Sequence, residues 1–172
     1  MGHRATKQLF IALLISLSCA GCDQLSKHYA KSELRYRSAQ SYLDNTIRLQ
    51  YAENSGVAFS LGAGLPRYLR TILFIIGPAL CLIGLLVFIV WHRPHELSSL
   101  LGLSMILGGG IGNLIDRLVH DGRVIDFLNL GIGQTFRTAI FNLADAAITA
   151  GMVLLIVSAL LSARREKFLP EQ

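Results

Sequence analysis

Charged side chains are scarce in this sequence, because Asp, Glu, Lys and Arg make up only 16% of its 172 residues. Soluble domains contain about 25% of these residues, whereas 52% of this chain is hydrophobic. The composition excludes an ordinary soluble enzyme and predicts a polytopic membrane protein. A chain of this length has little room for anything else, so we expect one membrane domain over residues 1–172.

Cysteine is also rare, and Cys19, Cys22 and Cys81 all lie in apolar segments without the spacing of a disulfide framework or a metal site. The five histidines are scattered and have no acidic or cysteine partner at metal-ligand spacing. We therefore expect no metal and no cofactor. The net charge of +5 comes mostly from basic residues in short segments beside apolar runs, so we expect no nucleic-acid partner.

Long apolar runs dominate the rest of the chain, and about 20 such residues suffice to cross a bilayer. They predict a membrane all-α fold with four transmembrane helices. The expected spans cover about residues 8–28, 71–91, 97–115 and 138–163. Gly108 and Gly112 lie four positions apart in the third span, so a neighbouring helix can approach it closely.

The one sizeable polar connection, residues 31–70, contains a β-strand pattern. Thr46–Tyr51 alternates polar and apolar residues, which is typical of a half-buried strand. Glu53–Gly56 follows as a turn signal, and Val57–Ser60 fits a return strand. The pattern predicts a small β-sheet at the outer membrane surface, over about residues 43–62.

The first apolar run, Gln8–Cys22, admits two interpretations. Its end, Cys19–Cys22, resembles the lipobox of a lipoprotein precursor, which would make the run a cleaved signal. The alternative is a retained first span, which must take in Asp23 and Lys27 because the uncharged run is too short to cross the membrane. These two residues lie four apart with the acid first, the favourable order for a helical ion pair. A precursor would continue into a soluble domain rather than three more spans, so we favour the retained helix.

Asp145 is the one charged residue in the apolar run Thr138–Ala163. A carboxylate inside a span costs at least about 2.5 kcal/mol on insertion scales and usually faces a partner or a wet cavity. A helix-end Asp at the lipid headgroups is the simpler alternative. Asp126, a second acid with apolar neighbours, lies just upstream near the same membrane boundary. Two such acids favour paired chemistry, in which one stays protonated and the other takes a proton from water.

An even number of spans places both chain ends on one side of the membrane. The connections 31–70 and 118–137 then lie together on the other side, so Asn54 and Asp126 share a face with the start of the fourth helix. The positive-inside rule is less decisive, because the long connection holds more basic residues but also acids that dilute them. The segments on the other side are more uniformly basic, and we therefore expect cytoplasmic termini.

Proton-coupled membrane transport is the alternative function, because intramembrane acids also serve as proton relays. Transporters commonly contain internal repeats and sites at the membrane midplane. This sequence has no internal repeat, and both acids fall near one face. Exchanging Asp for Glu would help to distinguish the two functions, since a catalytic pair demands tight geometry and a proton relay often tolerates the longer acid.

Five motifs, taken together and in order, resemble the bacterial lipoprotein signal peptidase family, signal peptidase II. They span the chain from about Asp23 to Thr149 and are therefore highly specific. The motifs are Asp23-Gln24-Leu25-Ser26-Lys27, Asn54-Ser55-Gly56-Val57-Ala58-Phe59, the glycine-rich segment Gly108–Arg117, Val124-Ile125-Asp126-Phe127, and Phe141–Thr149 with its core Asn142-Leu143-Ala144-Asp145.

The resemblance implies an aspartic peptidase of the bacterial inner membrane with its active site towards the periplasmic side. Its substrates would be diacylglyceryl-modified prolipoproteins, cleaved just before the lipidated cysteine. Membrane lipid and globomycin-type inhibitors would be further partners, and no metal would be used. Asp126 and Asp145 would form the catalytic dyad. The residues expected to line or support the site are Asn54, Gly56, Asn113, Arg117, Asn142, Asp23 and Lys27.

Overall fold

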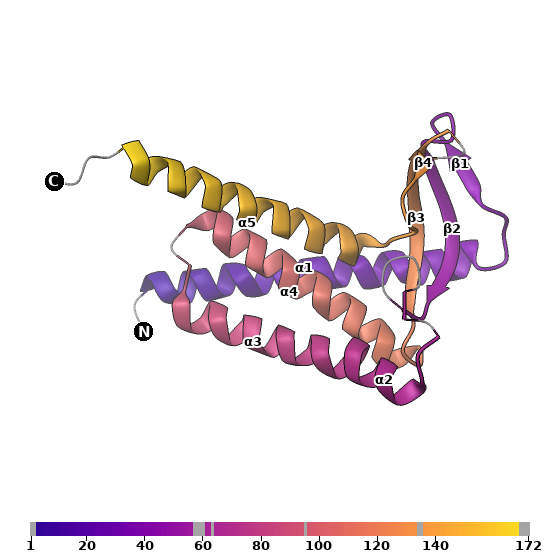
Figure 1. The fold of residues 1–172 in the computed structure, drawn as a ribbon, viewed down its shortest axis with the longest axis horizontal. Coiled ribbons are helices and arrows are strands. Elements are labelled where there is room, and N and C mark those ends of the chain that lie inside the picture. Colours follow the sequence, from indigo (N-terminus) through magenta and orange to yellow (C-terminus); the bar gives the residue numbers. More distant parts are fainter. Residues whose placement is uncertain (1–2, 57–60, 63, 95, 134–135, 169–172) are drawn as a thin grey trace.

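Four long helical segments form the body of the protein (Figure 1), and the computed structural model describes residues 3–56, 61–62, 64–94, 96–133 and 136–168. Each segment is long and apolar enough to cross a membrane, so the predicted membrane fold with four spanning helices is confirmed. They are α1 (His3–Leu34), the continuous series α2 (Arg67–Thr71), η2 (Ile72–Ile76) and α3 (Gly77–His92), then α4 (Leu97–Val119) and α5 (Leu143–Phe168).

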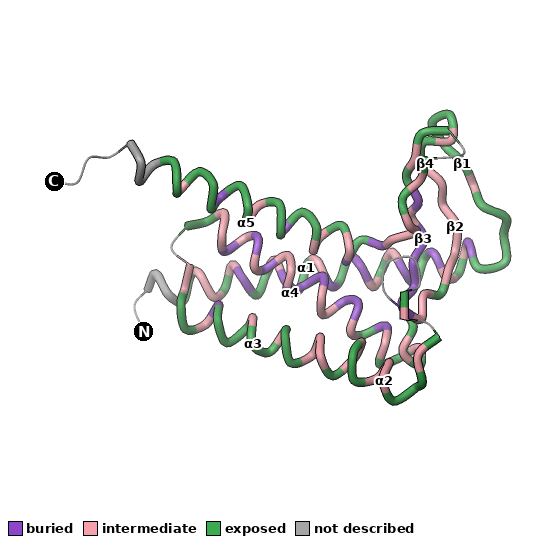
Figure 2. Tube along the Cα trace, in the orientation of Figure 1, coloured by how far each residue is buried: buried purple, intermediate pink, exposed green. Residues whose placement is uncertain are grey.

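Figure 2 shows exposed residues along the outer faces of these helices, and many of them are large apolar residues, as expected where lipid rather than water is the neighbour. Leu80 on α3 is 63% exposed and Leu160 on α5 is 62% exposed. Buried positions follow the inner faces of α1 and α4 instead, and they include polar side chains such as Ser16 and Ser104. The Ser16 hydroxyl donates to the Ser104 carbonyl oxygen over 3.0 Å, so the two helices are joined by a buried hydrogen bond.

Helix α4 is the central helix, and its glycines let its neighbours approach closely. A Cβ atom on Gly108 would lie 2.5 Å from the Ser16 carbonyl oxygen of α1. One on Gly109 would lie 2.5 Å from the Ala144 carbonyl oxygen of α5. One on Gly112 would lie 2.6 Å from the Asp23 carboxylate. The close helix approach predicted from Gly108 and Gly112 is therefore confirmed. As a result, the first turn of α5 and Asp23 of α1 pack against neighbouring positions of α4.

A four-stranded antiparallel sheet lies across one end of the helices, and both chain termini lie at the other end (Figure 1). The strands β1 (Gln40–Tyr42), β2 (Ile47–Asn54), β3 (Val124–Ile132) and β4 (Phe136–Arg137) pair in that order. The pairing of β2 with β3 shifts its register between Leu49 and Ala52 of β2. A small core of Ala30, Leu34 and Phe127 packs the end of α1 against the sheet.

The structure places the sheet where the sequence predicts one and adds strands that the sequence does not reveal. The predicted strand Thr46–Tyr51 corresponds to β2, which continues to Asn54, and the proposed return strand Val57–Ser60 lies outside the described residues. The partners of β2 are β1 and β3, although residues 118–137 were expected to form only a connection. Residues 124–127 of β3 are all buried, so this strand shows no alternation of polar and apolar positions.

Candidate active site

Helix α5 begins with a reciprocal pair of side-chain caps. The Asp145 backbone N–H donates to Asn142 Oδ1 over 2.9 Å, and the Asn142 backbone N–H donates to Asp145 Oδ2 over 3.2 Å. This capping-box arrangement satisfies two N–H groups that a helix start otherwise leaves unpaired. It also fixes the Asp145 carboxylate in the first turn of α5.

Strand β3 brings Asp126 to the same place. Asp126 is paired with Ala52 of β2 and is only 3% exposed. Asn142 Nδ2 donates to Asp126 Oδ1 over 2.7 Å, and Asn54 Nδ2 donates to Asp126 Oδ2 over 3.1 Å. Asn142 therefore contacts both acidic residues, Asp126 through its side-chain nitrogen and Asp145 through its side-chain oxygen and backbone N–H.

Burial, and to a smaller extent the negative charge of Asp145, raise the pKa of Asp126 to about 6. The hydrogen bonds from Asn54 and Asn142 act against this rise, because both stabilise the ionised form. Desolvation and the like charge have the larger effect. The proton of Asp126 is therefore held more tightly than that of an ordinary aspartate.

Asn113 of α4 separates this acid pair from a second group of charges. Its Nδ2 donates to Asp145 Oδ1 over 2.8 Å. Its Oδ1 accepts from Asn142 Nδ2 over 3.1 Å and from Lys27 Nζ over 3.0 Å. Because an asparagine amide offers donors on one side and an acceptor on the other, Asn113 can contact a carboxylate and an ammonium group at once.

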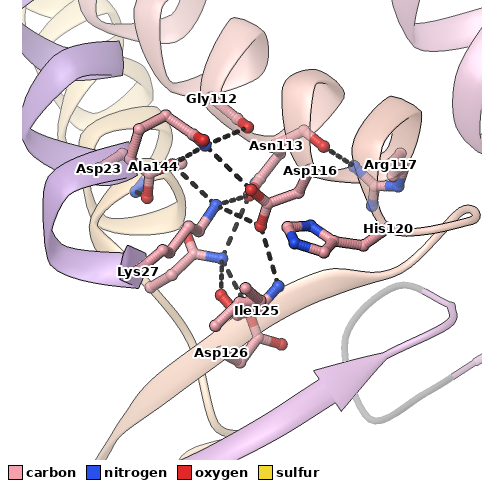
Figure 3. A network of polar contacts seen from close by, with 12 residues as sticks. Asp23, Lys27, Gly112, Asn113, Asp116, Arg117, His120, Ile125, Asp126 and Ala144 are labelled. Carbon is pink, nitrogen blue, oxygen red and sulfur yellow. Dashed lines mark hydrogen bonds and ion pairs between the residues drawn. The ribbon is translucent and has the colours of Figure 1, made fainter. Parts of the chain in front are cut away.

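The second group is a buried ion cluster of Asp23, Lys27 and Asp116 (Figure 3). Lys27 Nζ lies 2.7 Å from Asp23 Oδ2 and 3.0 Å from Asp116 Oδ2. All three residues are at most 1% exposed. Asp23 Oδ1 accepts the Ala144 N–H over 2.8 Å, and Asp116 Oδ2 accepts the Ile125 N–H over 2.9 Å. The cluster thus joins α1 and α4 to the start of α5 and to β3.

A cavity of about 290 Å³ opens beside the two acids. Asn54 and Gly56 lie on one side, and the Gly56 N–H donates to Asn54 Oδ1 over 3.0 Å, which leaves the Asn54 amide nitrogen facing Asp126. A second hollow of about 360 Å³ adjoins it along the sheet. The residues that line the first cavity are Asn54, Gly56, Arg117, Asp126, Ala139, Ile140, Phe141, Asp145, Ile148 and Thr149.

Residues 15–161 match the family model described as signal peptidase (SPase) II. The chain belongs to the signal peptidase II family. The resemblance inferred from the five motifs is confirmed, and the protein is a bacterial-type multi-pass membrane peptidase.

Relatives and solved structures agree with this membership. The lipoprotein signal peptidase of Streptococcus pneumoniae is 32% identical over 90% of this chain and 95% of its own length. That of Syntrophus aciditrophicus is 34% identical over 90% of this chain and 97% of its own length. A solved bacterial membrane enzyme superposes with a TM-score of 0.79 at 26% identity, covering 94% of each chain.

All nine predicted site residues of the peptidase lie in one region at the sheet end of the helices. Asp126, Asp145, Asn54, Gly56 and Arg117 line the cavity. Asn113 and Asn142 are hydrogen-bonded to the acids. Asp23 and Lys27 form an ion pair that contacts Asn113 through the Lys27 ammonium group. Among the residues that the structure describes, no group of three His, Cys, Asp or Glu side chains is arranged to hold a metal ion.

Two supporting residues were not singled out from the sequence, although both occur in the quoted motifs. Asp116 is the second carboxylate that contacts Lys27. Gln24 Nε2 donates to Asp116 Oδ1 over 2.9 Å and to the Gly112 carbonyl oxygen over 3.0 Å. The charge pattern of the sequence could have revealed Asp116. A lysine and an aspartate at the end of one span, with another aspartate at the end of a second span, indicate a larger ion cluster.

Proposed function

We propose that this chain is an aspartic endopeptidase that removes signal peptides from diacylglyceryl-modified prolipoproteins, cleaving just before the lipidated cysteine. The observation that carries the proposal is the position of Asp126 and Asp145, which face one cavity and are both hydrogen-bonded to Asn142. Family membership supports the substrate class, because the similar relatives are lipoprotein signal peptidases.

The cavity has the mixed lining that a lipidated peptide requires. Asn54 and the two acids provide polar contacts for a peptide bond, while Ile140 and Ile148 provide apolar ones. Ala139 and Ile140 also line the adjoining hollow, so an extended peptide can follow the sheet from one hollow into the other. The acyl chains would then lie against the apolar outer surface of α5, within the membrane.

The two acids have distinct roles in the proposed hydrolysis. Asp145, which lies at the helix start and accepts a hydrogen bond from the Asn113 amide, takes a proton from water as the water oxygen bonds to the scissile carbonyl carbon. Protonated Asp126 gives its proton to the carbonyl oxygen. When the C–N bond breaks, the proton on Asp145 passes to the leaving amine of the cysteine. Asp126 regains its proton as the new carboxyl group forms, which restores the starting state.

The orientation follows from the same proposal. The described helices place the sheet and the acids at one end, and both termini lie at the other (Figure 1). We place the sheet end at the periplasmic face of the inner membrane and the termini in the cytoplasm, because exported prolipoproteins present their cleavage site outside. Globomycin-type cyclic peptides should bind in the cavity and compete with the substrate.

The test is turnover of a purified lipidated prolipoprotein by full-length wild type, Asp126→Asn, Asp145→Asn and the double variant. Each single variant should lose at least about 1,000-fold in turnover, and the double variant should be no slower, since the two acids act as one unit. Thermal unfolding checks that each variant is folded, and a chelator should leave the wild type unaffected. Near-normal turnover in either single variant, or inhibition by the chelator, would overturn the proposal.

A further inference from the structure

A separate cavity of about 290 Å³ lies where α2 begins the second span and α4 ends. It is at the sheet end of the molecule, at the boundary between apolar helix and polar connection (Figure 1). Arg67, Arg70 and Arg117 line it, together with Asp121. Arg117 also faces Asp126 and Asp145 of the first cavity, which leaves Arg67 and Arg70 against Asp121, an excess of one positive charge that favours a negatively charged ligand.

The arginines of this cavity are not all neutralised by protein groups. Arg67 Nη2 lies 2.7 Å from Asp121 Oδ1, so one cation is paired. Arg70 Nε is buried and has no hydrogen-bond partner among the residues that the structure describes. Arg117 donates from Nη1 to the Asn113 carbonyl oxygen over 3.2 Å and lies on the far side of Asn113 from Lys27 (Figure 3). A buried guanidinium N–H without an acceptor is costly, and a bound anion would satisfy it.

The lining also has an apolar part. Ile75 and Leu118 form part of the wall, and Leu118 is 65% exposed. Tyr68 in α2 is 65% exposed at the same level, a position that interfacial aromatic residues favour. A free phosphate ion would use only the arginines. A lipid would use the arginines for its headgroup and the exposed apolar residues for its acyl chains.

We propose that this cavity binds the phosphate group of an anionic glycerophospholipid, held by Arg70 with Arg67 and Arg117. Guanidinium groups suit phosphate because their planar N–H donors match its oxygens in pairs. Arg117 lines both this cavity and the one beside Asp126 and Asp145. A bound headgroup would therefore share a side chain with the catalytic cavity without entering it.

The experiment measures binding of dioctanoyl phosphatidylglycerol to full-length protein in detergent by native mass spectrometry. Dioctanoyl phosphatidylcholine and glycerol 3-phosphate are the comparison ligands, since one lacks net charge and the other lacks acyl chains. The proposal expects the phosphatidylglycerol analogue to bind at least about tenfold more tightly than either. Equal binding of phosphatidylcholine would overturn charge recognition, and equal binding of glycerol 3-phosphate would make this an ion site instead of a lipid site.

Variants locate the binding. Arg67→Gln and Arg70→Gln should each weaken the phosphatidylglycerol analogue about fivefold, which corresponds to about 1 kcal/mol for each cation near an anionic lipid. Arg37→Gln is the matched control, because Arg37 is exposed beyond the end of α1 and paired with Glu33 at 3.0 Å. Turnover in phosphatidylcholine membranes should remain normal in all three variants, which shows that they are folded. If Arg70→Gln bound the analogue as tightly as Arg37→Gln, the site would be refuted.

Asp121 provides a test in the opposite direction. Asp121→Asn removes the anion that pairs with Arg67 in the lining. Binding of the phosphatidylglycerol analogue should then tighten about threefold to fivefold, because an exposed competing charge is worth up to about 1 kcal/mol. Unchanged or weaker binding in this variant would contradict recognition by the arginine cluster, whereas a nonspecific effect of mutation would not improve binding.

Discussion

Two groups of aspartates face opposite sides of Asn113, and they differ in how their charge is compensated. Asp23 and Asp116 both contact the Lys27 ammonium group. The other oxygen of Asp23 accepts the Ala144 N–H, and the other oxygen of Asp116 accepts from the Gln24 side chain. Asp126 and Asp145 receive only neutral amide and backbone donors from the contacts described above. Two carboxylates around one buried cation form a stable cluster, whereas two carboxylates without one compete for a proton.

The comparison shows why similar residues serve different purposes a few ångströms apart. The compensated cluster joins α1 and α4 to the start of α5 and to β3, so it holds the helix start and the strand at fixed positions. Asp126 and Asp145, which accept hydrogen bonds from asparagines rather than from Lys27, occupy those positions and face the cavity. In our proposal the first group builds the site and the second performs the reaction.

Lys27→Met should have the largest effect on stability, because it leaves two buried carboxylates without their cation. Breaking a buried ion pair costs about 3–5 kcal/mol, so little folded protein is expected. Asp23→Asn should be milder, since Lys27 keeps Asp116 as a partner. Thermal unfolding of purified protein in detergent compares the two variants. Equal loss of stability in both variants would show that the Lys27 charge does not stabilise the cluster by compensating the two carboxylates.

Asn142→Ala should reduce turnover about 100-fold or more, because it removes the contact that positions Asp126 and the cap that positions Asp145. Loss of the cap should also cost about 1 kcal/mol of unfolding free energy. Asn142→Ser is the matched control, since Ser also caps helices but its shorter side chain does not reach Asp126. It should regain most of the stability lost with the cap and still be slow. Normal turnover in Asn142→Ser would show that the hydrogen bond to Asp126 is dispensable.

Gly56→Val should reduce turnover about tenfold while the protein still folds and inserts. Gly56 lines the catalytic cavity, and a branched side chain there would occupy space needed by the substrate. Gly56→Ala is the smaller control and should lose less. The expected change is mainly a raised KM for a lipidated substrate. Full activity of the valine variant, with normal expression, would count against substrate contact at Gly56.

Asn54→Ala should shift the pH profile, which is the smallest effect expected here. The Asn54 hydrogen bond lowers the pKa of Asp126, so its loss should raise that pKa above its value of about 6. Because Asp126 acts in its protonated form in the proposed mechanism, the alkaline limb of the turnover profile should move to higher pH. Tyr51→Phe is the control, since the Tyr51 hydroxyl bonds Glu53 instead. A limb that moved to lower pH, or not at all, would contradict the protonated role of Asp126.

Much of the site could be predicted from the sequence because its residues occur in short, recognisable motifs. The acids, their asparagine partners and Lys27 were all named from the five motifs. Asp116 was not, since a lysine four residues after Asp23 already suggests a complete helical pair. Only the packing of α4 against α1 shows that Lys27 reaches a second carboxylate.

Strand β3, which contains Asp126, could not be predicted from the local sequence either. A half-buried strand alternates polar and apolar residues, as β2 does, and this local pattern survives in the sequence. Residues 124–127 are buried on both faces of the strand, and their sequence, Val124-Ile125-Asp126-Phe127, does not alternate polar and apolar residues. The local sequence does not reveal that this segment pairs with β2, because β2 lies about 70 residues earlier in the chain.

The sequence by itself determined the membrane class, the helical spans, the motif family and the identities of the acids, because hydropathy and short-range spacing are local properties. Tertiary structure decided which acids share a cation and which share a cavity. It also decided that the arginines of α2 and Arg117 of α4 meet in a second cavity. These properties depend on distances between residues far apart in the chain, and charge interactions and desolvation respond to those distances rather than to sequence order.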